Sequence, residues 1–166
     1  MNVLTNLVGG LSERIIAVVF AVAAAQFPLY YAAYSNTLAG AKLEAQSRLM
    51  ELETEAAKLQ LNVEAFIQRH ETNPDAAFRA SGRMHRTTLD HYRRYTAMDA
   101  ALRTPMLWQH PLALARNFDP ALHAATRFEP GLPLTAEGGV YALGGLLLAW
   151  LLTGLTGLVL GRRAYA

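Results

Sequence analysis

The sequence predicts an all-α membrane protein in which two transmembrane helices flank a periplasmic α-helical, coiled-coil-like hairpin. Three observations predict it. Residues 138–160 contain no charged side chain and nine leucines, and residues 15–25 read IIAVVFAVAAA. Between these stretches, apolar residues recur at alternating spacings of four and three over residues 35–71, which is typical of a helix with a coiled-coil seam.

The first segment, residues 1–34, is expected to hold a span from about residue 15 to residue 34, or one that begins nearer residue 7. Pro28 then lies toward the outer end of the span, where a kink costs least. We expect an aromatic belt at the membrane interface, formed by Tyr30, Tyr31 and Tyr34, with Tyr141 at the same level of the second span.

A cleaved signal peptide is the alternative for this segment, because an apolar core ending in Ala-Ala-Ala before Gln26 fits that template. The first thirteen residues carry no Lys or Arg, and apolar residues continue past the possible cleavage point. Both features favour a retained span.

The hairpin is expected over residues 35–103. Its first arm should be one helix over residues 35–71, with the seam formed by Leu38, Leu49, Leu52, Leu59, Val63 and Phe66. Thr72-Asn73-Pro74-Asp75 breaks this helix, and a second one should run from Pro74 or Asp75 to about Arg103. Residues 36–71 contain six acidic and four basic side chains, whereas residues 76–103 contain six arginines and two aspartates. An acidic arm beside a basic arm predicts an antiparallel pair with opposite charges flanking the seam.

Residues 104–137 form a proline-rich return segment, with short helical turns expected after Pro111 and at Asp119-Pro120. Its apolar residues should pack on the base of the hairpin or lie at the membrane surface. Thr135 should cap the second span, residues 138–160, which at about 1.5 Å per residue can cross a hydrocarbon core of about 30 Å. No other part of the chain could cover this helix on all sides, which disfavours the alternative of a buried core helix.

The positive charges next to the spans predict the orientation. Arg14 precedes the first span, and Arg162 and Arg163 lie in the tail of residues 161–166. Because basic residues in short flanks stay in the cytoplasm, we expect both termini to be cytoplasmic and residues 35–137 to be periplasmic, at the inner membrane of a bacterium.

Several short motifs resemble a proteobacterial family of small membrane proteins known as domain of unknown function 2937. Gln26-Phe27-Pro28 with Tyr34, Leu38 and Gly40 resembles the family's start, although Asn36-Thr37 stand where Gln-Arg is expected. Pro111-Leu112-Ala113, Phe118-Asp119-Pro120 and Leu132-Pro133-Leu134-Thr135 are similar to its closing part. The resemblance implies a two-span inner-membrane protein and supplies no activity or catalytic residue.

The second span carries a ridge of small residues that recurs every four positions, and the first span carries a matching one. Small residues let helix backbones approach closely in lipid. We expect helix–helix packing within the chain, with a second copy or with another membrane protein through Gly145, Ala149, Thr153, Gly157 and Gly161, and through Ala17, Ala21 and Ala25.

No pattern indicates catalysis, a cofactor or a metal. His85 and His91 are six residues apart and so face different sides of a helix, and they are at most weak candidates for pH sensitivity. Cysteine is absent, which excludes thiolate chemistry. The net charge of +2 is too small to indicate nucleic-acid binding.

The leading functional hypothesis is therefore a non-enzymatic structural or accessory protein, associated with the lipid bilayer and with itself or another membrane protein. A pore or transport component is the first alternative. It would need polar residues facing inward, and only Gln26, Thr153 and Thr156 qualify. A membrane-bound enzyme that uses His85 or Asp90 is the second alternative.

Overall fold

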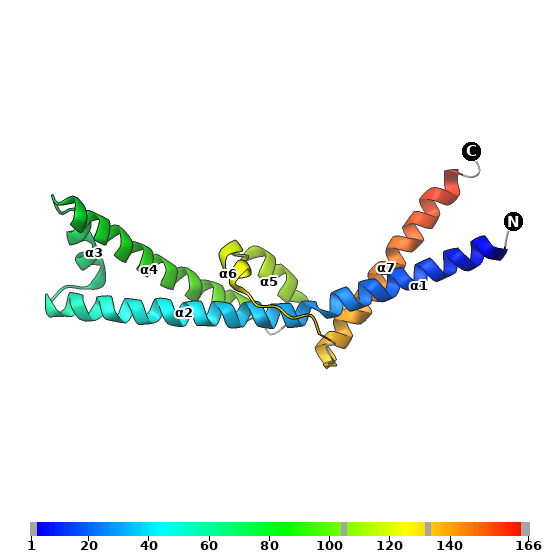
Figure 1. Ribbon diagram of the computed structural model, residues 1–166, viewed down its shortest axis with the longest axis horizontal. Coiled ribbons are helices and arrows are strands. Elements are labelled where there is room, and N and C mark those ends of the chain that lie inside the picture. The colour runs from blue at the N-terminus through cyan, green and yellow to red at the C-terminus, as the bar shows by residue number, and fades with distance from the viewer. Residues whose placement is uncertain (1–2, 104–105, 132–133, 164–166) are drawn as a thin grey trace. The chain divides into compact units, whose positions relative to one another are not determined.

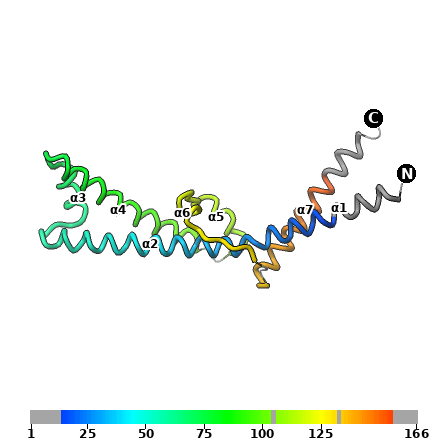
Figure 2. The backbone as a smooth tube through the Cα atoms, viewed as in Figure 1, coloured from blue at the N-terminus to red at the C-terminus, as the bar shows by residue number. Residues whose placement is uncertain are grey.

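A computed structural model describes the backbone of residues 3–103, 106–131 and 134–163, and the side chains of residues 14–103, 106–131 and 134–155. The part of the chain described is helical and contains no strand. It divides into two compact units, Met1–Ala33 with Arg127–Ala166, and Tyr34–Thr126. In Figure 2 the residues with described side chains are coloured.

The first unit is built on two long helices, α1 (Val3–Ala25) and α7 (Ala136–Arg163), which pack against each other (Figure 1). Two stretches of the described chain are long and apolar enough to cross a membrane, one that begins in α1 and runs past its end at Ala25, and one in α7. Residues 14–58 contain one with a mean hydropathy of 1.9 in its most apolar window, and residues 136–155 contain one of 1.6. The Thr135 hydroxyl oxygen accepts a hydrogen bond from the Gly138 N–H at 3.1 Å, as expected of a cap at the start of α7.

The first expected span is interrupted at Gln26, where α1 ends and α2 (Phe27–Lys58) begins. Pro28 has no N–H and so cannot continue the hydrogen-bond ladder of α1, but it fits the first turn of a new helix. The Gln26 N–H donates to the carbonyls of both Val22 and Ala23 at 3.2 Å, and the Tyr30 N–H donates to the Gln26 carbonyl at 3.0 Å. The ladder therefore resumes immediately beyond the break.

In the second unit, the stretch expected to form the first arm of a hairpin is two helices and not one. α2 ends at Lys58, Gln60 adopts a left-handed φ of 58°, and α3 (Val63–Glu71) starts after Asn62, whose side chain accepts from the Ala65 N–H. The chain leaves the helix at this point, so Leu59 is 54% exposed and does not belong to the seam. The break allows α3 to fold back between the ends of α2 and α4 (Figure 1).

The second arm, α4 (Ala76–Leu102), agrees closely with expectation, and the Asp75 carboxylate accepts from the Ala77 N–H at its start. A core forms where α2, α3 and α4 meet. It contains Leu49, Leu52, Ala56, Phe66, Ile67 and Leu89, with Leu61, Val63 and Tyr92 packed against it. Burying a side chain of this kind stabilises the fold by about 1.5–3 kcal/mol, so this core holds the three helices together.

The return segment forms the short helices η1 (Leu107–Gln109), α5 (His110–Arg116) and α6 (Pro120–Ala125). Asp119 caps α6 by accepting from the Ala121 N–H at 2.8 Å, and Pro120 occupies the first turn, as expected. Leu114 and Leu122 are buried, while Trp108 is 75% exposed. Residues up to Thr126 therefore belong to the same unit as the hairpin.

Candidate functional site

One of the small residues expected on α7, Gly145, packs closely against α1. Gly145 lies so close to α1 that an added Cβ would be 2.5 Å from the Phe20 carbonyl oxygen and 2.9 Å from the Ala24 Cβ. Ala149 and Ala25 are buried, and Ala17, Ala21 and Thr153 are partly buried. The surroundings of Gly157 and Gly161, which were expected to extend the ridge, lie outside the described residues. Gly145 therefore marks a close contact between two helices of one chain, and the residues that it meets, Phe20 and Ala24, lie beside the expected small residues of α1 and are not among them.

The opposite faces of α1 and α7 are apolar and exposed. Trp150 is 74% exposed. Aliphatic side chains of these helices are also more than half exposed, among them Val18, Val19, Leu143, Leu147, Leu151 and Leu155. The two helices thus bury their small residues against each other and turn their large ones outward. This is the reverse of a helix pair in water, where the large apolar residues occupy the interface.

Gln26 lies between α1 and α2, and its side chain is engaged within the same unit. Its amide nitrogen donates to the Gly131 carbonyl at 2.8 Å, and its amide oxygen accepts from the Gly131 N–H at 3.1 Å. The amide nitrogen and the amide oxygen of Gln26 are therefore both hydrogen-bonded to the backbone of Gly131. This arrangement fixes residue 131 beside the helix break, and it disfavours Gln26 as a side chain that lines a pore.

Aromatic side chains gather around this point. Phe27 lies 5.2 Å from Tyr141 and 5.9 Å from Tyr31, and Tyr30 packs edge-on against Phe128 at 5.6 Å, measured between ring centroids. Tyr141 therefore lies at the level of Phe27 and Tyr31.

Tyr34 departs from the belt expectation, because it is fully buried in the second unit. Its hydroxyl accepts from the Asp119 N–H at 2.9 Å and donates to the Asn117 carbonyl at 3.3 Å. The Asp119 carboxylate, itself buried, pairs with Arg94 of α4 at 2.9 Å. This network joins α2, α4 and the start of α6, so Tyr34 cannot face lipid headgroups.

A second ion-pair group joins α2 to α4. Lys42 lies 2.6 Å from Asp99, which also pairs with Arg103 at 3.1 Å. Hydrogen bonds from Lys42, and then from Arg103, lower the pKa of the Asp99 carboxyl below its usual 3.8. Lys42 follows the seam residue Leu38 by four positions, and its ion pair with Asp99 explains why a cation is accommodated on this face of α2.

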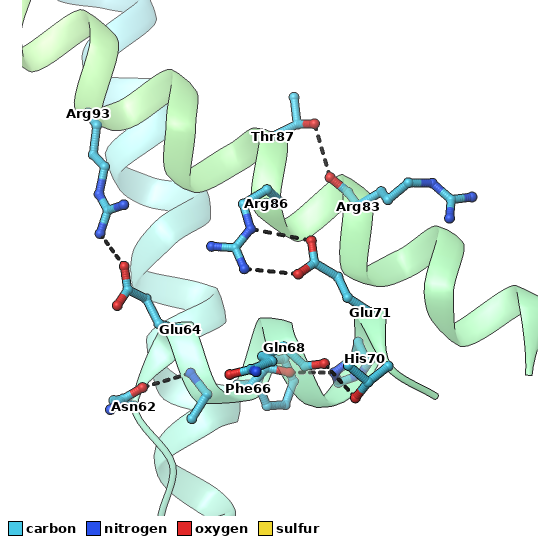
Figure 3. Close-up of polar contacts among 12 residues, drawn as sticks. Asn62, Glu64, Phe66, Gln68, His70, Glu71, Arg83, Arg86, Thr87 and Arg93 are labelled. Atoms are coloured by element: carbon cyan, nitrogen blue, oxygen red, sulfur yellow. Dashed lines mark hydrogen bonds and ion pairs between the residues drawn. The ribbon is translucent and has the colours of Figure 1, made fainter. Parts of the chain in front are cut away.

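At the other end of the unit, α3 lies against α4 through a close approach at Gly82. A Cβ on Gly82 would be 2.7 Å from the Glu71 backbone nitrogen. Arg86 makes two hydrogen bonds to Glu71, and Arg93 pairs with Glu64 at 2.6 Å (Figure 3). These bonds lower the pKa of both glutamates. The ion pairs expected between the acidic first arm and the basic second arm are made here by glutamates of α3, and not by those of α2.

Two histidines meet at the same junction. The rings of His70 (α3) and His85 (α4) are 5.5 Å apart and perpendicular, and both lie against Phe66. His85 also forms a hydrogen bond with the Ser81 hydroxyl at 3.0 Å. Burial, and then the neighbouring His70, lower the pKa of His85. In the part of the chain that the structure describes, no group of three or more His, Cys, Asp or Glu side chains could hold a metal.

A groove runs between α2 and α4. Three open hollows follow one another along it, with volumes of about 130, 560 and 500 Å³. Arg48 and Thr88 line both the first and the second hollow, and Glu55 lines both the second and the third. The hollows therefore form one continuous groove, which we call the α2–α4 groove. Sequence reasoning missed it, because the heptad pattern suggested a closed seam.

The chain was compared with known families, curated proteins and solved structures. Residues 9–165 match the model of a family described as "Protein of unknown function (DUF2937)". The curated proteins and the solved structures give no match.

Proposed function

Because the chain belongs to the DUF2937 family, whose description names no activity, we propose a function from its own geometry: a non-enzymatic accessory or structural protein of the bacterial inner membrane. α1 and α7 anchor it in the bilayer as a packed pair. The unit of residues 34–126 lies outside the bilayer and binds a protein partner.

The observation that carries this proposal is the outward exposure of large apolar side chains on α1 and α7. Leu143 and Leu147 are each more than 60% exposed, although their helix is packed against α1 through Gly145 and Ala149. Each such leucine gains about 1.5–3 kcal/mol when it leaves water. Hydrocarbon offers that environment, and it also explains why small residues form the contact between the helices.

Two spans place everything between them on one side of the membrane. The basic residues that flank the spans in the sequence, Arg14, Arg162 and Arg163, favour cytoplasmic termini and a periplasmic unit. The polar clusters of that unit support a binding role over a catalytic one. Arg86, Arg93 and Arg94 are each engaged with a carboxylate of the same unit, and these contacts maintain the shape of the surface.

Cysteine labelling of intact cells tests the proposal, because the natural chain has no cysteine. Leu43→Cys, at an exposed position of α2, should react with a membrane-impermeant maleimide from outside once the outer membrane is permeabilised. Val18→Cys, in the apolar face of α1, is the matched control and should stay unlabelled until the membrane is dissolved. Recovery of the protein without detergent, or equal labelling of both positions, would overturn the proposal.

A further inference from the structure

The helices η1 and α5 follow each other without a gap and form one helical stretch with two different faces. The residues of its inner face recur at spacings of three and four and are buried or partly buried: Leu107, His110, Leu114 and Asn117. The residues between them point the other way. Trp108 and Leu112 are 75% and 52% exposed there, so the described part of the chain leaves this outer face open.

The outer face is apolar, whereas a helix that faces water carries polar residues on its outer side. Between residues 106 and 116 the exposed polar residues are Gln109 and Arg116. The other exposed residues of this stretch are Met106, Trp108, Pro111, Leu112 and Ala115. We call these seven residues together the α5 outer face. An exposed tryptophan beside aliphatic side chains is typical of helices that lie in the interface of a membrane.

The charge of this surface suits an anion. From residue 106 to residue 126 the one acidic residue is Asp119, whose side chain is 8% exposed and paired with Arg94. Arg116 makes no ion pair with any described residue. With Leu112 it lines an open hollow of about 380 Å³ that no acidic residue lines. A guanidinium in this setting, beside an apolar wall, matches the phosphate of a lipid headgroup.

The α5 helix is attached to the part of α2 that follows the first span. The carbonyl of Asn117, at the end of α5, accepts a hydrogen bond from the Tyr34 hydroxyl. Tyr34 is seven residues from Phe27 on the same helix, and Phe27 contacts Tyr141 of α7. Seven residues of helix extend about 10 Å. This distance is measured along α2 and holds whatever angle α2 makes with the membrane.

We propose that the α5 outer face binds the headgroup region of the lipid bilayer, with Trp108 and Leu112 among the upper acyl chains and Arg116 on a lipid phosphate. This inference rests on the proposed function, because α1 and α7 must first anchor the chain in the same bilayer. The contact attaches the unit of residues 34–126 to the membrane surface at a second place, through residues that do not span the bilayer.

Tryptophan fluorescence tests the inference, because the chain has two tryptophans, Trp108 and Trp150, one in each unit. The full-length Trp150→Phe variant keeps Trp108 alone. It is reconstituted into vesicles of phosphatidylcholine and phosphatidylglycerol, with or without bromine atoms on the upper part of the acyl chains. Bromine quenches a tryptophan that it contacts, so the brominated vesicles should lower the emission of Trp108 by about two-fold or more if its ring lies in the interface.

Two further variants calibrate this measurement. Trp108→Phe keeps Trp150, on the exposed face of α7, and the brominated lipid should quench it. The matched negative control adds Met50→Trp, at an exposed position of α2, to a chain in which both natural tryptophans are replaced by phenylalanine. Its emission should be quenched by acrylamide in the water and not by bromine.

Charge reversal provides the second measurement. Arg116→Glu in the Trp150→Phe chain places an anion against the phosphates and should reduce the bromine quenching of Trp108 by about two- to five-fold. Arg116→Lys keeps the charge and should retain most of the quenching. Arg69→Glu is the matched control, because it makes the same change at an exposed arginine of α3 that also lacks an ion pair. Circular dichroism of each variant confirms that the helices are retained.

Quenching of Trp150 without quenching of Trp108 would overturn the inference and leave the membrane proposal standing. Trp108 shielded from acrylamide but unaffected by bromine would show that a protein covers the α5 outer face, which would also overturn it. Equal effects of Arg116→Glu and Arg69→Glu would overturn the contact between Arg116 and phosphate. If bromine quenched neither natural tryptophan, the proposed function would fall together with the inference.

Discussion

The carboxamide of Gln26 and the backbone of Gly131, which are 105 residues apart in the sequence, hold each other through two hydrogen bonds of 2.8 and 3.1 Å. The contact ties the start of α2 to the segment that leads into α7. It gives a structural role to a side chain that the sequence alone offered as a candidate for transport.

Replacing Gln26 with leucine should therefore destabilise the first unit. The substitution removes both bonds and leaves the Gly131 N–H and carbonyl without these partners, which should lower the free energy of unfolding by about 1–3 kcal/mol. Thermal unfolding in mild detergent, followed by circular dichroism, measures the change, and Val18→Leu on the exposed face of α1 is the control. A liposome ion flux that Gln26→Leu abolishes without any loss of stability would argue for a pore instead.

Gly145→Ala should separate α1 from α7. The new Cβ would meet the Phe20 carbonyl oxygen at 2.5 Å, which is closer than contacting atoms allow, so the backbones must move apart. Overpacking of this kind costs about 1–3 kcal/mol. Gly144→Ala is the matched control, because its Cβ would meet nothing within 4 Å. Equal melting temperatures for the two variants would contradict the close packing of the helices.

Gly82→Ala should loosen the junction of α3 and α4. Its Cβ would lie 2.7 Å from the Glu71 nitrogen and 2.9 Å from the Glu71 Cγ, so α3 would have to shift and the Arg86–Glu71 bonds would weaken. We expect a loss of about 1–3 kcal/mol. Gly40→Ala in α2, where the space is open, should instead stabilise the helix by up to about 1 kcal/mol. Chemical denaturation of both variants distinguishes these outcomes.

Tyr34→Phe tests the buried network between α2 and the start of α6. The buried Asp119 N–H would lose the hydroxyl oxygen that it donates to at 2.9 Å, while the ring could still stack on Phe118. An unsatisfied buried donor costs about 1–3 kcal/mol. Tyr95→Phe on α4 is the comparison, and unfolding of the two variants should differ by that amount. A neutral Tyr34→Phe would show that the hydroxyl is dispensable.

Stability should fall in mild acid because of His85. Its pKa is lowered in the folded protein by burial and by His70, so the unfolded chain takes up a proton first as the pH drops. Stability is therefore complete above the ordinary value of 6.5 and is lost as the pH falls from there through the lower, folded-state pKa. His85→Gln should reduce the change in melting temperature between about pH 7.5 and about pH 5.5. His91→Gln, an exposed histidine of the same helix, should leave that change in place.

Several elements follow from local sequence alone. The spacing of Leu38, Leu49 and Leu52 predicted which face of α2 is buried, and all three side chains are buried. The cap at Asp119 and the start of the second arm at Asp75 are also where the sequence places them. These features depend on residues within one or two helical turns, and so the sequence pattern contains them.

The heptad pattern wrongly predicted one continuous helix where the chain changes direction after Lys58. It continued the first arm through Leu59, whereas α2 ends at Lys58 and Gln60 takes a left-handed conformation. A heptad spacing continues formally across such a break, because the residues after it again have an apolar face. Only the packing of Phe66 and Ile67 into the core with Leu49 and Leu52 shows that α3 folds back.

By itself the sequence determined that the chain is helical, that two of its stretches are apolar enough to span a membrane, and which family it belongs to. These properties lie in composition, periodicity and short motifs. Tertiary structure alone decided that Gln26 holds Gly131, that Tyr34 is buried beside Asp119, and that α2 and α4 leave an open groove. Such contacts depend on which distant surfaces meet and how closely, and no local pattern specifies that.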